Sequence, residues 1–155
     1  MTALFAVLLL AAAMAQEPPA QLPALPLPAG GDAWTVRVET TGGFTGRGTG
    51  NLTATSAGEV FCVLIVRCPR RLIPEANRSL SQLVRAIPLI APPPRSSSST
   101  TNTTCNDCVT TRMTVQRRDE DGEHTLRYTW DVSTAHAVPE EALRLRAAIL
   151  GLTAP

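Results

Sequence analysis

WTVRVETTGGFTGRGTGNLTAT, residues Trp34 to Thr55, is the stretch from which the fold can be worked out. Its first part alternates, so that Trp34, Val36 and Val38 would share one face and the polar residues between them the other. A period of two residues is typical of a strand with one buried face. The alternation then stops, and a second alternating run covers Gly50 to Thr55. The stretch therefore predicts two strands joined by a glycine-rich loop.

The loop, GGFTGRG at residues 42–48, places four glycines around a single aromatic residue, Phe44. Glycine permits a positive φ and the close approach of another backbone, so the loop can be tight or can lie against a partner. Phe44 either folds back as a lid over the sheet or enters a pocket of a partner protein, and the two alternatives stay open. The predicted partner-binding loop consists of Gly42, Gly43, Phe44, Thr45, Gly46 and Arg47.

Residues 1–15 have the pattern of a secretory signal peptide, with a short apolar run that ends in the cleavage motif Ala13-Met14-Ala15. The run is too short to span a membrane. Cleavage there would make Gln16 the new N-terminus, with no membrane insertion of the processed chain. Residues 16–32 contain five prolines and no helical or strand period, which indicates an extended linker. We therefore expect a secreted or periplasmic protein.

Size and charge limit the classes of function. The processed chain would have roughly 140 residues, enough for one domain with its own core, here residues 33–155. A formal net charge of +1 argues against a nucleic-acid partner, which basic proteins hold by neutralising phosphates. All 14 basic residues are Arg, so lysine-based catalysis is excluded.

Further along the chain, VFCVLIV at residues 60–66 is a continuous apolar run of strand length. We expect this strand to be buried on both faces, or paired and covered. A helix is predicted from Pro74 to the residue before Pro88, because apolar residues recur there at helical spacing. Residues 88–104 are rich in Pro and Ser and predict a flexible loop.

The C-terminal part predicts a hairpin and a helix. Val109–Gln116 alternates, the turn at residues 119–122 ends in an Asp-Gly pair, and Leu126–Val132 alternates again. Pro139 and two acidic residues would begin the last helix, whose buried stripe would consist of Ala142, Leu145, Ile149 and Leu152. The predicted fold is α+β: an antiparallel sheet of four to five strands with two helices packed on one face.

A search for catalytic patterns finds no metalloprotease, nucleophile-elbow or phosphate-binding motif. His124 and His136 lie in polar segments and are poor candidates for a metal pair. The acidic residues near the Asp-Gly turn are those of a solvated turn. We therefore expect no enzyme, no metal and no cofactor, although a small secreted enzyme is a third, weaker alternative.

The four cysteines are Cys62, Cys68, Cys105 and Cys108. The Cys105–Cys108 pair has redox-motif spacing, but it precedes a predicted strand, whereas a redox motif opens a helix that lowers the thiol pKa. A four-cysteine zinc site is disfavoured by the wide separation of the first pair. Disulfides are the simplest interpretation for an exported protein. A crossed pairing would close the longer loop and stabilise more, yet three connectivities remain possible.

Four features follow one another along Trp34–Leu152: a strand leading into GGFTGRGTG, a helix near residues 80–87, a C-x-x-C entry into a hairpin with an Asp-Gly turn, and a closing helix after PEEAL at residues 139–143. Together they resemble the emfourin-like proteins. That family is named for a bacterial protein inhibitor of protealysin, a thermolysin-type zinc metalloprotease. The leader, the Pro/Ser loop and the cysteines depart from the family pattern, so retention of inhibition is left open.

The resemblance implies a non-catalytic protein that binds and inhibits a zinc metalloprotease through the loop at residues 42–48. A rigid sheet that presents a short turn with one aromatic residue can fill an active-site cleft at low ordering cost. Phe44 would occupy the apolar pocket next to the scissile bond. The alternative is an envelope or extracellular interaction domain with no protease partner; the sequence leaves the oligomeric state open.

Overall fold

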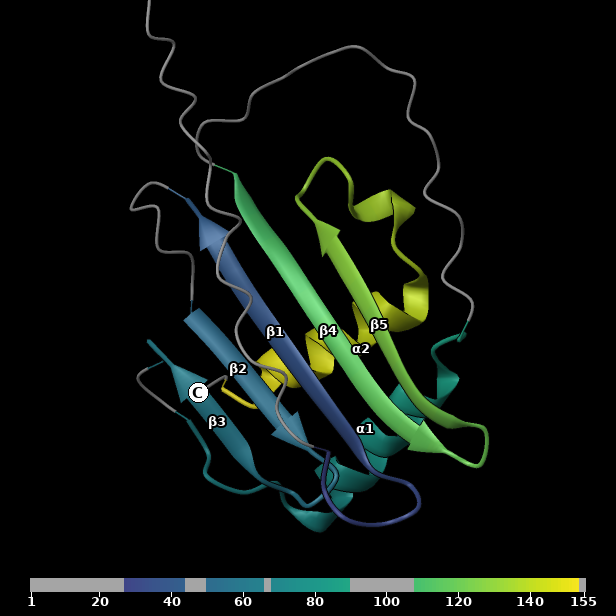
Figure 1. The fold of residues 1–155 in the computed structure, drawn as a ribbon. Coiled ribbons are helices and arrows are strands. Elements are labelled where there is room, and N and C mark those ends of the chain that lie inside the picture. Colours follow the sequence, from purple (N-terminus) through teal and green to yellow (C-terminus); the bar gives the residue numbers. More distant parts are fainter. Residues whose placement is uncertain (1–26, 44–49, 66–67, 90–107, 154–155) are drawn as a thin grey trace, which may run out of the picture.

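The structure is a computed structural model that describes residues 27–43, 50–65, 68–89 and 108–153. Within them, five strands form one antiparallel sheet in the order β3-β2-β1-β4-β5 (Figure 1). The strands are β1 (Trp34–Gly42), β2 (Gly50–Thr55), β3 (Val60–Val63), β4 (Val109–Asp119) and β5 (Gly122–Trp130). The central strand is thus β1, and β3 and β5 are the two edges.

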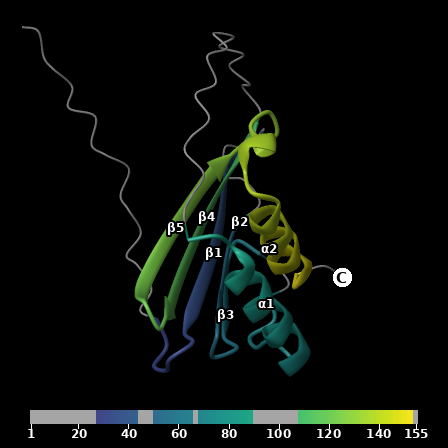
Figure 2. The same cartoon turned by 90° about the vertical axis from the view of Figure 1, so that its right-hand side faces the viewer.

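Two helices, α1 (Pro74–Ala86) and α2 (Glu140–Gly151), cover the same face of the sheet, as Figure 2 shows. A short 3-10 helix, η1 (Ala135–Ala137), lies between β5 and α2. Proline in the first turn of α1 and two acidic residues in the first turn of α2 suit the starts of helices. The arrangement confirms the predicted α+β fold with both helices on one face.

The core lies between the sheet and the two helices. Its central layer comes from the alternating faces of the strands, where Val36, Val38, Met113 and Val115 are at most 1% exposed. The helices contribute Leu80, Val84, Ala142, Leu145 and Ile149, and the residue after α1 contributes Ile87; all six are buried. The predicted stripes of both helices are therefore confirmed at their central positions, because each helix turns that stripe toward the sheet.

The predicted hairpin is confirmed, with β4 and β5 paired from Thr111–Trp130 to Asp119–Gly122. Leu126, Tyr128 and Trp130 are buried as expected. The prediction that the strand continues to Val132 was wrong, because β5 ends at Trp130 and Val132 is 83% exposed. The strand ends earlier because the Asp131 carboxylate accepts hydrogen bonds from the backbone N–H groups of the second and third residues after it, at 2.8 and 2.9 Å.

The expectation for residues 60–66 was also wrong. The strand in this run is only four residues long, stands at the edge of the sheet and is not covered: Phe61 is 52% and Val63 58% exposed. Leu64, at φ 66°, adopts a left-handed conformation that ends the strand. Apolar composition indicates a strand here, but it does not determine whether a neighbour covers it.

Side-chain hydrogen bonds tie the helical layer to the sheet. The indole Nε1 of Trp34 on β1 donates to Ser81 Oγ on α1 at 2.9 Å. Arg117 on β4 donates from Nη1 to the carbonyl oxygens of Val84 at 2.9 Å and Ile87 at 3.0 Å. The guanidinium thereby satisfies carbonyl groups that the end of a helix leaves without intrahelical partners.

Several predictions fall on residues outside the described ranges. These are the leader at residues 1–15, most of the linker, and residues 90–104 of the predicted flexible loop. Among the residues that the structure describes, no helix is both long and apolar enough to cross a membrane.

Candidate protein-binding site

The predicted loop leaves the sheet at the end where β1 stops, β2 begins and β3 stops. Thr40 lies opposite Gly50 in the β1–β2 ladder, and Asn51 lies opposite Val63 in the β2–β3 ladder. The three strands therefore meet there, side by side. We call this end of the sheet, with Gly42, Gly43, Gly50 and the exposed side chains of Phe61, Val63 and Leu64, the β3 rim.

Glycines are required at the base of the loop. Gly42 and Gly43 have φ values of 87° and 73°, and a Cβ on Gly42 would lie 2.3 Å from the Cys108 carbonyl oxygen. On the other side, Gly50 has φ 102° and a Cβ there would lie 2.5 Å from the Val63 carbonyl oxygen. Both ends of the loop are thus pressed against neighbouring backbone, which only glycine permits.

Four of the predicted loop residues, Phe44, Thr45, Gly46 and Arg47, lie outside the described residues. Their part in binding stays a prediction. The two that are described lie next to β4, where Gly43 N–H donates to the Cys108 carbonyl at 3.3 Å. The structure therefore fixes where the loop begins and ends on the sheet.

Apolar side chains are exposed beside this loop. Phe61 and Val63 lie two residues apart on β3 and so share a face, and Leu64, which follows, is 71% exposed. Sequence reasoning missed all three as surface residues because it assigned the apolar run to the interior. The spacing of Cys62 and Cys68 could have corrected this, since a local disulfide folds the chain back and ends the strand.

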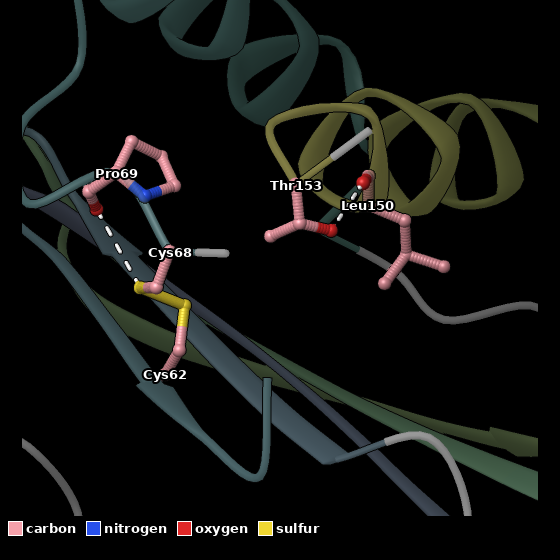
Figure 3. The surroundings of a disulfide bond; sticks show 5 residues. All are labelled: Cys62, Cys68, Pro69, Leu150 and Thr153. Atoms are coloured by element: carbon pink, nitrogen blue, oxygen red, sulfur yellow. Dashed lines mark hydrogen bonds between the residues drawn. A yellow bond between two sulfur atoms is a disulfide. The ribbon is translucent and has the colours of Figure 1, made fainter. Parts of the chain in front are cut away.

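Cys62 and Cys68 are joined by a disulfide, with their Cα atoms 6.0 Å apart (Figure 3). Cys68 Sγ lies 3.5 Å from the Pro69 carbonyl oxygen, but this is a contact and no hydrogen bond, because a disulfide sulfur carries no proton. Cys108 is also disulfide-bonded, and Cys105 lies outside the described residues. The local pairing of Cys62 with Cys68 excludes the crossed connectivity.

The outer edge of β3 is only partly paired. Val60 N–H donates to the Arg70 carbonyl at 3.2 Å, and Glu59 forms an isolated bridge with Arg71. Beyond Val60, no described segment hydrogen-bonds to this edge. The disulfide that links Cys62 to Cys68 thus holds a short, apolar and open piece of edge strand in one conformation.

The candidate metal residues are not brought together. His124 lies near the start of β5, with Nε2 3.1 Å from Asp119 Oδ1, and His136 lies in η1, beyond the end of that strand. In the described part of the chain, no three His, Cys, Asp or Glu side chains form a group able to hold a metal ion.

A small cleft of about 210 Å³ lies at the opposite end of the sheet from the β3 rim. Its charged lining is engaged internally. Arg85 pairs with Asp32 at 2.8 Å, Arg118 pairs with Glu123, and Arg117 lies 3.6 Å from Asp119. The cleft therefore offers little unpaired charge to a ligand, and the β3 rim is the better candidate site.

No protein-family model, curated protein or solved structure matches the chain.

Proposed function

We propose that the chain is an exported, non-catalytic binding protein that inhibits a thermolysin-type zinc metalloprotease through the β3 rim and the adjoining loop. The observation that carries the proposal is the exposure of three large apolar side chains, two on a strand held by a disulfide and one directly after it, next to a loop framed by glycines. Exposed apolar residues that gather at one place are typical of an interaction site.

The β3 rim has the physical properties that an inhibitor needs. Binding of a mobile segment loses affinity because the segment must be ordered, whereas a segment already held in one conformation avoids that cost. The disulfide and the backbone contacts of Gly42 and Gly50 hold this end of the sheet. Phe44 would supply the aromatic anchor, and Phe61, Val63 and Leu64 would extend the apolar contact.

Export fits the same proposal. Disulfides persist in oxidising compartments, and the Cys62–Cys68 bond is compatible with an extracellular or periplasmic location. The predicted signal peptide at residues 1–15 would deliver the chain there. Thermolysin-type enzymes that a cell secretes would be available in the same compartment.

An inhibition assay with the purified protein tests the proposal. Cleavage of a peptide substrate by several thermolysin-type enzymes is measured with the protein at micromolar concentration. Leu64→Asn should weaken inhibition about tenfold or more, since it removes an exposed apolar side chain. Asn suits the positive φ of this position better than Leu, so stability should not fall. Val132→Asn, also at an exposed apolar residue, is the matched control.

Phe44→Ala decides between the two roles left open for that residue. If Phe44 is an anchor, the variant should lose about 2 kcal/mol or more of binding and little stability. If Phe44 is a lid over the sheet, the variant should instead lose about 3 to 5 kcal/mol of stability. Unchanged proteolysis by every enzyme tested, with the wild-type protein at saturating concentration, would remove the inhibitor proposal.

The alternative function, an envelope or extracellular interaction domain with no protease partner, would use the same apolar surface. A neighbouring gene for a thermolysin-type enzyme would favour the inhibitor, and its absence would favour the alternative.

A further inference from the structure

The second edge of the sheet, β5, is nine residues long and regular. It pairs with β4 on its inner side, and no described segment pairs with its outer side. An uncovered edge strand presents a row of backbone donors and acceptors to any chain that can align with it.

The ladder identifies the outward groups. Arg118 N–H donates at 2.8 Å to the carbonyl oxygen of Ala33, the residue before β1. The backbone N–H and C=O groups of even-numbered residues of β4 therefore point to β1, and those of odd-numbered residues point to β5. Their partners on β5 are His124, Leu126 and Tyr128, which therefore bond inward. The residues that present their N–H and C=O groups outward are Glu123, Thr125, Arg127 and Thr129, and all four are exposed.

The first three of these residues, Glu123, Thr125 and Arg127, carry an acidic, a neutral and a basic side chain in turn, a pattern centred on Thr125. The Glu123 carboxylate pairs with Arg118 through Oε1 alone. For Arg127, the described residues supply no ion pair and no side-chain hydrogen bond. The edge thus carries one carboxylate and one unpaired guanidinium at equal distances from its centre.

We propose that two copies of the chain associate through this edge, with β5 antiparallel to β5 of the second copy about a two-fold axis at Thr125. In that register, Glu123 of each copy lies opposite Arg127 of the other. A two-fold interface requires a surface that is complementary to itself, and this pattern meets the requirement. Opposite charges in directly facing positions stabilise paired strands, and like charges destabilise them.

Other registers are less favourable. An axis at Arg127 or at Glu123 places that residue opposite its own copy, and an axis at Leu126 or His124 places each charge opposite a threonine or beyond the pairing. A partner strand of another protein would gain nothing from the symmetry of the pattern. The pairing would join two sheets and leave both β3 rims at the outer ends, so the dimer would carry two copies of the candidate binding site.

Edge-to-edge pairing of one short strand buries little surface, so the association should be weak. The test is sedimentation of the chain, purified as the producing cell processes it, from about 10 µM to about 1 mM. Glu123→Arg and Arg127→Glu should each weaken dimerisation about tenfold or more, because each places like charges opposite one another twice. A 1:1 mixture of the two variants should restore association, since every facing pair is then opposite in sign.

Thr125→Pro is an independent test. Its N–H points away from β4, so proline removes no hydrogen bond within the chain and should leave the unfolding midpoint nearly unchanged. It should abolish dimerisation. The proposal is overturned if the wild-type chain stays monomeric at about 1 mM, if the mixture associates no better than the single variants, or if a folded Thr125→Pro protein still dimerises. Should that variant not fold, the charge variants decide.

Discussion

The two edge strands of the sheet, β3 and β5, differ in length and in the side chains that they expose. The short β3 edge, with four residues, is apolar on its exposed face and is ended by a disulfide and a left-handed Leu64. The β5 edge, with nine residues, is polar on its exposed face and apolar only toward the core. The β3 edge exposes large apolar side chains on a short strand, whereas the β5 edge exposes polar side chains beside a long row of backbone donors and acceptors.

This difference separates two kinds of recognition. A short apolar edge cannot offer many backbone hydrogen bonds, so a partner must bind its side chains, as a protease pocket binds an apolar residue. A long polar edge offers a ladder but few apolar contacts, which suits strand pairing. The proposed inhibition therefore suits the β3 rim, and the proposed self-association suits β5.

The largest expected effect is on core packing behind β5. Trp130 is 5% exposed and has the Arg146 guanidinium 5.9 Å from its ring centroid, so Trp130→Ala should cost about 3 to 5 kcal/mol of unfolding free energy. Phe61→Ala, at the β3 edge, should cost less than about 1 kcal/mol, because the ring is 52% exposed. Denaturant unfolding of both variants measures the contrast. Equal losses of unfolding free energy would mean that Phe61 is packed in the core. The β3 rim would then not be an exposed apolar surface.

Removal of the Cys62–Cys68 disulfide should have the next largest effect. Loop-closure entropy for a ring of this size predicts a loss of about 2 kcal/mol in the double variant Cys62→Ser, Cys68→Ser. Because the bond holds the apolar edge in place, inhibition should fall along with stability. Urea unfolding and the inhibition assay are compared for the variant and the oxidised wild type. A variant with reduced stability and full inhibition would show that the rim needs no covalent constraint.

The sequence predicted the parts of the fold in which burial produces a period. The alternation in β1 and β5 and the stripes of α1 and α2 each have one face against the core, so their patterns were sufficient. The run at residues 60–66 lacks a period, because an edge position and the local Cys62–Cys68 disulfide determine its exposure. The edge position depends on contacts distant in sequence, and the pairing of four cysteines cannot be deduced from sequence. Gly42 was recognised as permissive and Gly50 was assigned to a strand, but the backbone that presses against both glycines could not be identified from sequence.

Arg117 anchors the β4–β5 side of the sheet to α1. Arg117→Met keeps the apolar stem and removes the donors to the carbonyls of Val84 and Ile87, so unfolding free energy should fall by about 1.5 kcal/mol. Arg144→Met removes an exposed ion pair with Glu140 and is the control, with an expected cost below about 0.5 kcal/mol. Thermal or urea unfolding distinguishes the two. Equal small losses would contradict a capping role for Arg117.

The smallest effect is expected at Tyr128, on the core side of β5. Its hydroxyl is buried and has no hydrogen-bond partner in the described structure, so Tyr128→Phe should change stability by less than about 0.5 kcal/mol near neutral pH, or raise it slightly. Burial raises the pKa of this hydroxyl above its ordinary value of 10.0; Arg117 lowers the pKa and Glu141 raises it. The pKa of Tyr128 is higher in the folded than in the unfolded protein, so only the unfolded chain ionises readily just above pH 10. The wild-type protein should therefore lose stability as the pH rises from about 10 toward the folded pKa.

Tyr128→Phe should be free of that loss. Tyr128 is the chain's single tyrosine, so absorbance of the tyrosinate reports on it alone. A titration midpoint at or below 10 in the folded protein would show that the hydroxyl reaches water, and that the core behind β5 is as open as the β3 edge.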